Sequence, residues 1–503
     1  MAIFNKYQEQ NRQVSAVTHW EYDKTILELQ KVRDCVEGSP QIKRLGYTYL
    51  PHPSQIDKES PQARQRYIEY KTGAEFDEYP SKTLKSMLGK MRIHNLECEL
   101  PSQIEYLKNN IDGDGTSLQA SVEYCASNNI QMKWQVLVAD YQGLGDVDLS
   151  SVTLAESAEM MPQATIKQYV RENVVNWHFD RVNGVMQLAW IMLLERGSEF
   201  NQETYSHDQL ESYLILALDE NGDYYQQKIV YGSGETRKGE RSYVTINGKT
   251  LKTLPVVVVS DEEKPPASLP SQVGFLHGIC ESTLHKYNVS AVYKETQRNL
   301  SPTVNTTGWT DHSFELFSKI NGRDHILTGG VSVNNLPDGV SVDVMSVEMS
   351  MSDFQWYFDK SDKKIRMMGG ANNVDAGIQT ATEADINAAE QNAMLETLVN
   401  NLEDGWKMAI AYCGMFEGLW LESDIEKNLE NIKMKLPKDF ASPKLSVEEV
   451  GKILEMYQSG LRTESQVVKQ LAQGGWDYQD AETTIAELEG GGDFNRSGDL
   501  SDL

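Results

Sequence analysis

The sequence predicts an α+β protein that is built from several parts. Residues 1–130 carry apolar side chains mainly at helical spacing, whereas residues 131–260 change to short alternating or apolar stretches that are typical of strands. The rest of the chain shows long helical patterns on both sides of a small mixed segment. A length of 503 residues exceeds what one hydrophobic core usually serves, so we expect several domains or one multi-part subunit.

The composition is acidic, with a formal net charge of -27, and its hydrophobic content of 40% excludes wholesale disorder. A protein that grips nucleic acid needs a basic surface, so the chain as a whole should repel DNA. Two interpretations of the acidity stay open: it provides solubility, or it lets DNA slide through a passage without adhering. The cysteines lack paired spacing, which suits synthesis in a reducing cytosol. We expect neither a membrane span nor a secretory signal.

In the first half of the chain, helices are expected at residues 20–38 and 81–91. Strands are expected within four later stretches, where ENGD and INGK are turn signals. These stretches are residues 132–141, 185–197, 212–232 and 241–259. A helix is expected to interrupt them at residues 161–177. The charged and proline-rich segment 261–270 marks a boundary.

The stretch NNIDGDGTSLQASVE resembles a calcium loop, with Asp112 and Asp114 followed by Glu123 at the twelfth position. Ser117 stands where such a loop needs glycine. We therefore favour a capping box in which Thr116 starts a helix and Gln119 follows three residues later.

The second half begins with a long helix within residues 268–300, followed by an extended segment, a short helix at 313–320 and paired strands within 324–348. A second helix spans residues 351–368, and after a glycine-rich loop a third runs from 381 to about 414. Thr380 and Glu383 form a T-x-x-E capping box at its start. Six residues at helical spacing give this helix an apolar stripe: Leu395, Leu398, Leu402, Trp406, Ala409 and Cys413. We interpret it as a structural spine.

The sequence contains no P-loop, GxSxG, HExxH or CxxC pattern, and we predict no catalytic residue, cofactor or metal. His277, Glu281 and His285 would share one face of a helix, which is the basis of an alternative hypothesis of a metal-dependent hydrolase. Three ligands so far apart on one helix cannot converge on one ion, so packed or interface histidines are the favoured interpretation.

A basic cluster, Lys360, Lys363, Lys364 and Arg366, lies at the end of the second helix. Cations there complement the helix dipole, but they could also face a polyanion if the subunit is repeated around an axis. Both interpretations stay open.

The order of these parts resembles the portal proteins of tailed bacteriophages, in a branch long catalogued as a domain of unknown function. Five collinear patches carry the resemblance: YIEYKTGAEFDEYPSKTLKSMLGKM, IDGDGTSLQ, LHKYNVSAVYKETQRNLSPTV, ILTGGVSVNNLPDGVSV and TATEADI. The resemblance implies a portal fold in the following order: wing (1–265), first stem helix (266–300), clip (301–348), second stem helix (349–369), tunnel loop (370–380), long wing helix and wing closure (381–443), and a short helical crown with an acidic tail (444–503).

The resemblance also implies a non-enzymatic function. Such a protein forms a ring, commonly of twelve subunits, at one capsid vertex, where DNA is packaged and ejected. It is made in the host cytoplasm and resides in the virion. The implied partners are the major capsid protein, the terminase large subunit in transient contact, head–tail adaptor proteins and double-stranded DNA that passes without sequence specificity; no membrane is involved. Another head–tail connector, a minor capsid protein and a host-encoded oligomeric scaffold are alternatives.

If the chain is a portal, two groups of residues should face the DNA channel. The loop GGANNVDAGIQ combines glycines with amide side chains, and we predict that it lines the constriction. Its candidates are Gly369, Gly370, Asn372, Asn373, Asp375 and Gln379, and the candidates at the basic stem end are Lys363, Lys364 and Arg366. Thr380 and Glu383 would define where the loop stops and the helix begins.

Overall fold

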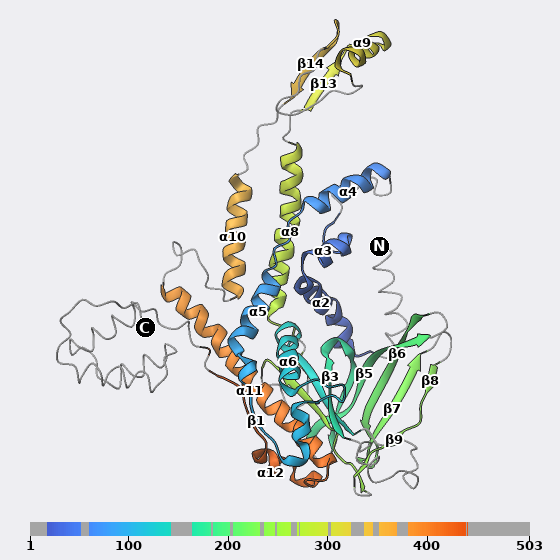
Figure 1. Cartoon of the computed structure of the whole chain (residues 1–503), viewed down its shortest axis with the longest axis vertical. Coiled ribbons are helices and arrows are strands. Elements are labelled where there is room, and N and C mark those ends of the chain that lie inside the picture. Colours follow the sequence, from blue (N-terminus) through green and yellow to red (C-terminus); the bar gives the residue numbers. More distant parts are fainter. Residues whose placement is uncertain are drawn as a thin grey trace, which may run out of the picture. The chain divides into compact units, whose positions relative to one another are not determined.

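The computed structural model of the chain describes residues 18–51, 60–141, 163–182, 185–201, 205–231, 236–246, 249–262, 269–270, 272–299, 303–322, 336–345, 352–369, 381–438 and 440. The chain divides into two compact units, Met1–Leu436 and Pro437–Leu503, and the helices and strands given below lie in the first. They are a mixture of α-helices and antiparallel sheets (Figure 1), which confirms the predicted α+β class.

Helices make up most of the chain before the first long strand. They are α2 (Trp20–Glu37), α3 (Ser39–Leu45), α4 (Pro61–Gly73), α5 (Tyr79–Met91) and α6 (Leu118–Met132), with the 3-10 helices η1 (Gly46–Thr48), η2 (Ile93–Asn95) and η3 (Ser102–Lys108). The His19 ring accepts a hydrogen bond from the Glu21 N–H at the start of α2. Gly38, which follows α2, has a φ of +91°, a conformation that favours glycine. The helices predicted at residues 20–38 and 81–91 are therefore confirmed.

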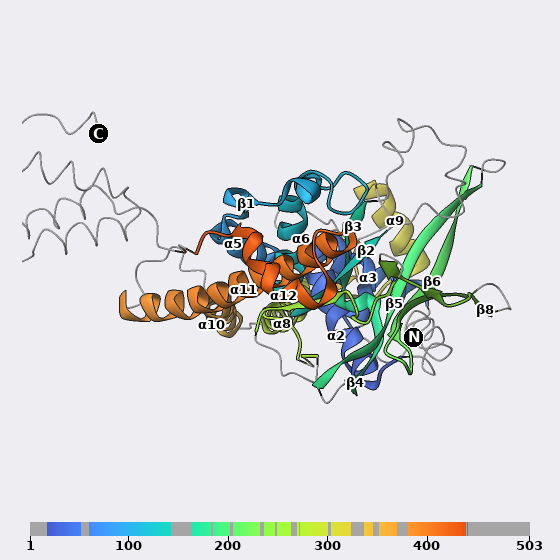
Figure 2. The same ribbon diagram turned by 90° about the horizontal axis from the view of Figure 1, so that it is seen from below.

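A three-stranded antiparallel sheet has the order β12–β2–β3. Its strands are β2 (Trp134–Tyr141), β3 (Ala164–Val170) and β12 (Val256–Ser260). The long helix α11 (Ala381–Phe416) and α6 pack against this sheet and against each other (Figure 2). All six residues of the apolar stripe predicted on α11 are buried, so the spine interpretation is confirmed. They are Leu395, Leu398, Leu402, Trp406, Ala409 and Cys413.

A second sheet is an antiparallel meander in the order β4–β5–β6–β7–β8. Its strands are β4 (Val174–Val182), β5 (Val185–Asn201), β6 (Ser206–Leu218), β7 (Tyr224–Tyr231) and β8 (Thr236–Lys238), with β9 (Ser242–Tyr243) also paired to β7. At the predicted ENGD turn, Asp219 accepts hydrogen bonds from the N–H groups of Asn221 and Asp223, each at 2.8 Å. The INGK signal lies between the paired strands β10 (Thr245–Ile246) and β11 (Lys249–Thr250). The ENGD turn is therefore confirmed, whereas Asn247 and Gly248 of the INGK signal lie outside the described residues.

The helix predicted at residues 161–177 is wrong. Within that range, Ala164–Val170 forms β3, a 3-10 turn at Arg171–Asn173 (η5) follows, and β4 begins at Val174. The segment contains good helix formers, but β3 pairs with β2 over its whole length and β4 pairs with β5. Ladder hydrogen bonds and side-chain burial in the two sheets outweigh a local helix propensity that amounts to tenths of a kcal/mol per residue.

The predicted capping box at Thr116 is also wrong, because the cap lies one residue later. The Ser117 hydroxyl accepts a hydrogen bond from the Ala120 N–H at 3.2 Å, and α6 starts at Leu118. The Thr116 N–H donates instead to the Asp112 carboxylate at 3.1 Å, and the Asp114 N–H donates to the same oxygen at 2.9 Å. The aspartate that resembled a calcium ligand therefore closes a turn on its own backbone.

The second half of the chain contains the remaining elements. They are α8 (Leu276–Asn299), β13 (Thr303–Thr307), α9 (Asp311–Asn321), β14 (Ser341–Met345), α10 (Ser352–Gly369), α11, η6 (Glu422–Asp424), α12 (Ile425–Asn428), η7 (Leu429–Asn431) and β15 (Lys433–Lys435), which pairs with β1 (Glu97–Glu99). These bounds confirm the helices predicted within 268–300, 313–320 and 351–368. No helix among the described residues is both long and apolar enough to cross a membrane. The shorter helices predicted after residue 444 lie outside the described residues.

The insertion between α8 and α10 is a small α/β unit. Its strands β13 and β14 are antiparallel, so β14 pairs with the extended segment before α9 rather than within residues 324–348. Thr310 and Ser313 form a capping box at the start of α9. Gly308 has a φ of +87°, and a Cβ atom there would lie 2.2 Å from the Gly339 carbonyl oxygen. Only glycine permits this close approach of the two chain segments.

Candidate functional site

Two long helices, α8 with 24 residues and α10 with 18, lie side by side and run in opposite directions (Figure 1). Near the insertion, the Tyr293 ring of α8 lies 5.4 Å from the Phe354 ring of α10. At the opposite end, the Ser282 hydroxyl donates to the Met368 sulfur at 3.8 Å. Contacts along the whole pair therefore hold the chain as it leaves for the insertion and returns from it.

Lys286 joins the two helices from a buried position on α8. Its ammonium group lies 2.8 Å from the Asp77 carboxylate, and it also donates to Asp362 of α10. The Tyr79 and Phe358 rings lie 5.5 and 5.9 Å from the same ammonium group. Burial opposes the charged form, but the hydrogen bonds to Asp362 and Asp77 raise the pKa of Lys286 above its ordinary value. Lys286 therefore stays charged and ties α8 both to α10 and to the segment before α5.

The predicted basic cluster lies on the C-terminal half of α10, but its members differ. Lys363 and Lys364 are exposed, and neither has an ion-pair partner among the residues that the structure describes. Arg366 is half-buried and forms a hydrogen bond with Tyr79. Lys360 lies over the Trp356 ring, 4.7 Å from its centre. Lys360, Lys363 and Lys364 are therefore exposed on α10, whereas Arg366 contributes to the contact with α5.

Gly369 is the last residue of α10 and is buried. A Cβ atom at Gly369 would lie 2.9 Å from the Thr83 hydroxyl oxygen of α5, so the glycine permits close packing. The other predicted tunnel-loop residues, Gly370, Asn372, Asn373, Asp375 and Gln379, lie outside the described residues, as does Thr380. Glu383 lies in the first turn of α11, which begins at Ala381. The channel role of this loop and the capping box both stay predictions.

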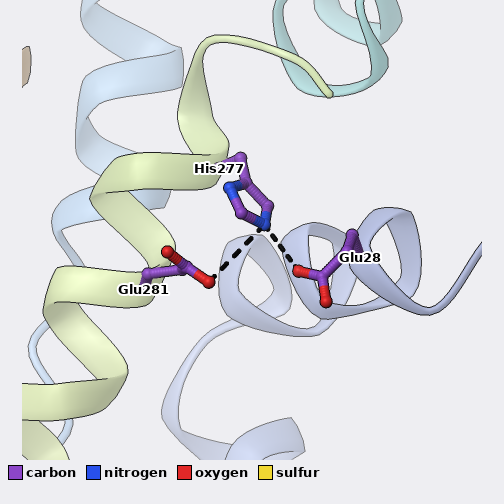
Figure 3. Close-up of side chains that lie close together, drawn as sticks. All are labelled: Glu28, His277 and Glu281. Carbon is purple, nitrogen blue, oxygen red and sulfur yellow. Dashed lines mark hydrogen bonds and ion pairs between the residues drawn. The ribbon is translucent and has the colours of Figure 1, made fainter. Parts of the chain in front are cut away.

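The three residues of the hydrolase hypothesis are not brought together. His285 forms a hydrogen bond with Tyr357 of α10, away from the other two. His277 Nε2 lies 3.8 Å from Glu281 Oε1 and 2.6 Å from Oε2 of Glu28, a residue of α2 (Figure 3). The Lys31 ammonium contacts Glu28 and lies 3.4 Å from Glu281. Burial alone would raise the pKa of Glu28, but hydrogen bonds from His277 and Lys31 hold it below its ordinary value.

Glu28 is a member of this cluster that sequence reasoning missed. It is 249 residues away from His277 in the sequence, so no spacing rule connects them. No spacing rule predicts the partners of Lys286 either. Asp77, from the segment before α5, and Asp362, from α10, both bind its ammonium group. A lysine in the middle of a long helix gives no local signal of its partners.

No protein-family model and no curated protein matches the chain. Among solved structures, the neck of a native GTA particle computed with C12 symmetry matches at 11% identity, covering 85% of this chain and 98% of that chain, with a TM-score of 0.38. The virion of a native gene transfer agent particle matches at 10% identity, covering 84% and 94%, with a TM-score of 0.36.

A third match is the crystal structure of a HK97-family phage portal protein from Corynebacterium diphtheriae. It is 8% identical, covers 71% of this chain and 91% of that chain, and has a TM-score of 0.30. These three matches cover from 71% to 85% of this chain.

Proposed function

We propose that the chain is a portal subunit, which assembles into a ring at one vertex of a phage-like capsid and forms the channel for DNA. The observation that carries this proposal is the order of elements in the second half of the chain. A long helix, a small α/β insertion and an antiparallel long helix are followed by residues 370–380 and by α11. The sequence resemblance to portal proteins implies the same order.

In this proposal α8 and α10 are the paired stem helices, and the unit of β13, α9 and β14 is the clip. The insertion follows α8 and precedes α10 in the chain, so the helix pair must be stiff to hold it in place. The buried Lys286 and the aromatic contacts of Tyr293 supply that stiffness. Residues 1–265 and 381–443 would be the wing, and residues 444–503 the crown and tail.

The helix pair leaves large apolar side chains in water. Trp356 is 63% exposed, and Val292 and Met367 are each 46% exposed. A ring places a copy of the chain on each side of every subunit, and a heterologous contact that closes can cover such residues. The exposed apolar residues therefore agree with assembly into a ring. The angles of the subunit contacts, and not these residues, would set the proposed number of twelve copies.

Charge supports passage rather than binding of DNA. Each subunit has a formal net charge of -27, so a ring repels duplex DNA on average. Lys363 and Lys364 near the end of α10 would add local positive charge beside residues 370–380. Two exposed cations in an acidic channel give weak contacts to phosphates without sequence specificity. The proposed partners at the ends of the channel are the terminase and the head–tail adaptor proteins, and at its rim the major capsid protein.

Electron microscopy of the purified full-length protein tests this function. End-on views should show a ring with a central opening wide enough for duplex DNA, and native mass spectrometry should give the number of subunits. A homogeneous monomer under all conditions would contradict the proposal.

A matched pair of variants tests whether the helix pair forms the contact between subunits. Trp356→Glu should reduce the fraction of rings, because it places a charge in a covered apolar surface. Trp20→Glu on α2 changes a tryptophan of similar exposure, 65%, and should leave the rings intact. Rings that form equally well with Trp356→Glu would place the subunit contact elsewhere.

A further inference from the structure

Three potential ligand groups converge where α2 meets the start of α8 (Figure 3). Glu28 comes from α2, and His277 and Glu281 come from successive turns of α8. Their nearest nitrogen and carboxylate oxygens all lie within 4.8 Å of one another. His277 is mostly buried, whereas the Glu281 side chain is 55% exposed, so the group is open to ions from solvent on one side.

The single proton on His277 Nε2 cannot form hydrogen bonds to both carboxylates, Glu28 and Glu281. His277 Nε2 is 2.6 Å from Glu28, and an ionised carboxylate can only accept a hydrogen bond. Nε2 must therefore carry the proton and donate it to Glu28. Glu281, at 3.8 Å, is too far from the same nitrogen to share that hydrogen bond. Two carboxylates thus face one nitrogen, and only one of them is bound by it.

A divalent ion in place of that proton can bind all three groups. Metal–nitrogen and metal–oxygen bonds of about 2.0 to 2.2 Å put neighbouring ligand atoms roughly 3 to 3.5 Å apart. The distance from His277 to Glu28 has to increase slightly, and that from His277 to Glu281 has to decrease. The spacing i, i+4 of His277 and Glu281 places both on one helix face, and the exposed Glu281 side chain is free to move.

In this structure the Lys31 ammonium group lies beside the two carboxylates of the cluster. It contacts Glu28 and lies 3.4 Å from Glu281. It partly neutralises the two carboxylates, and it would compete with a metal ion for them. The Lys31 side chain is 23% exposed, so its ammonium can move into solvent when a doubly charged ion arrives.

We propose that Glu28, His277 and Glu281 form a structural binding site for a divalent transition-metal ion of the Zn²⁺ class. The imidazole nitrogen favours such an ion over Mg²⁺, which prefers oxygen ligands in an octahedral shell. Three protein ligands leave a position for water. The bound ion would fasten α2 to the first turns of α8, at the end of the helix pair opposite the α/β insertion. The proposal does not depend on the proposed portal function.

Titration calorimetry of the metal-depleted full-length protein with Zn²⁺ tests the site. We expect saturation at one ion per chain, no comparable signal with Mg²⁺, and a higher unfolding temperature in excess Zn²⁺. His277→Ala and Glu281→Gln should abolish this binding. The Glu281 side chain is exposed, so Glu281→Gln should fold even if His277→Ala does not.

Three further variants separate this site from others. His285→Ala removes the histidine two turns along the same helix and should leave Zn²⁺ binding unchanged. Lys31→Met removes the competing cation and should tighten binding by about tenfold. Cys280→Ser should have no effect, because the free thiol of Cys280 is buried and is not a ligand in this proposal.

Four results would overturn the proposal. They are the absence of Zn²⁺ binding to the wild type, unchanged binding in both His277→Ala and Glu281→Gln, loss of binding in Cys280→Ser, and weaker binding in Lys31→Met. The ring images that test the portal function are obtained without added Zn²⁺, so the two proposals fail separately.

Discussion

Lys286 of α8 and Asp362 of α10 form an ion pair in which the lysine is only 9% exposed. The same ammonium group also binds Asp77, which lies just before α5. One buried cation thus holds two antiparallel helices and a third segment from another part of the chain. Because a buried charge without partners is costly, the pair specifies how α8 and α10 lie against each other.

Replacing Lys286 with methionine should loosen the helix pair. The change keeps most of the side-chain volume but leaves Asp362 without its buried counter-charge, at a cost of about 2 kcal/mol after allowing for the partial exposure of both carboxylates. Hydrogen–deuterium exchange should be faster in peptides of α10, and a thermal unfolding experiment should give a lower unfolding temperature. The matched control is Lys85→Met on the exposed face of α5, which should change stability by less than about 0.5 kcal/mol. Equal effects of the two substitutions would show that Lys286 is no more important than a surface lysine.

The stabilisation by Lys286 should disappear at alkaline pH. The carboxylates of Asp362 and Asp77 raise its pKa above the ordinary 10.5 despite burial. A raised pKa means that the stabilisation is complete below pH 10.5 and is lost as the pH rises through the folded-state pKa. Partly buried tyrosines with raised pKa values, such as Tyr79, act in a similar window. The measurement is therefore the difference in unfolding temperature between wild type and Lys286→Met, which should be constant from pH 7 to 10 and shrink above it. A difference that grows with pH would reverse the sign of this argument.

Replacing two helical glycines with alanine should change the stability of the protein in opposite directions. In α11, a Cβ atom at Gly405 would lie 2.6 Å from Cγ2 of Val259, a stiff β-branched residue of β12. Gly405→Ala should therefore destabilise the protein by about 1 to 3 kcal/mol, because α11 must move off the sheet. In α5, nothing lies within 4 Å of a Cβ atom at Gly89, so Gly89→Ala should stabilise by about 0.5 to 1 kcal/mol. Urea unfolding of both variants measures the contrast, and a stabilised Gly405→Ala would show that α11 does not approach β12 so closely.

Deletion of residues 371–378 tests the proposed channel role of the loop between α10 and α11. The deletion should impair packaging or retention of DNA, because the segment is proposed to line the constriction. Ring assembly should persist, since the contacts of α10 with α8 and α5 do not involve this segment. Nuclease-protected DNA in assembled particles and end-on images of the purified variant measure the two effects. Normal packaging by the deletion variant would remove the loop from the channel hypothesis.

Several elements could be predicted from the sequence because local pattern determines them. The apolar stripe of α11 has one strong period over many residues, and all six predicted positions are buried. The ENGD signal marks a turn because asparagine and glycine adopt the required backbone conformations. The long helices α8 and α10 follow from periodicity alone. The collinear sequence patches also resemble portal proteins, and this resemblance does not depend on the tertiary structure.

Other features depend on partners that are far away in the chain. Residues 164–170 have no strong strand pattern of their own and become β3 because β2 offers an unpaired edge. Thr116 and Ser117 are both good cap residues, and the Asp112 carboxylate, by binding the Thr116 N–H, decides for Ser117. Strand β14 pairs with β13, although α9 lies between the two strands in the sequence.

The same distinction applies to the functional residues. The sequence by itself determined the α+β class of the fold, the order of its helices and the basic cluster on α10, since these depend on residue type and short spacing. Only the tertiary structure decided that Lys286 binds Asp77 and Asp362, that His285 contacts Tyr357, and that Glu28 joins His277 and Glu281. The physical reason is that hydrogen bonds and ion pairs act over about 3 to 4 Å in space, whatever the separation along the chain.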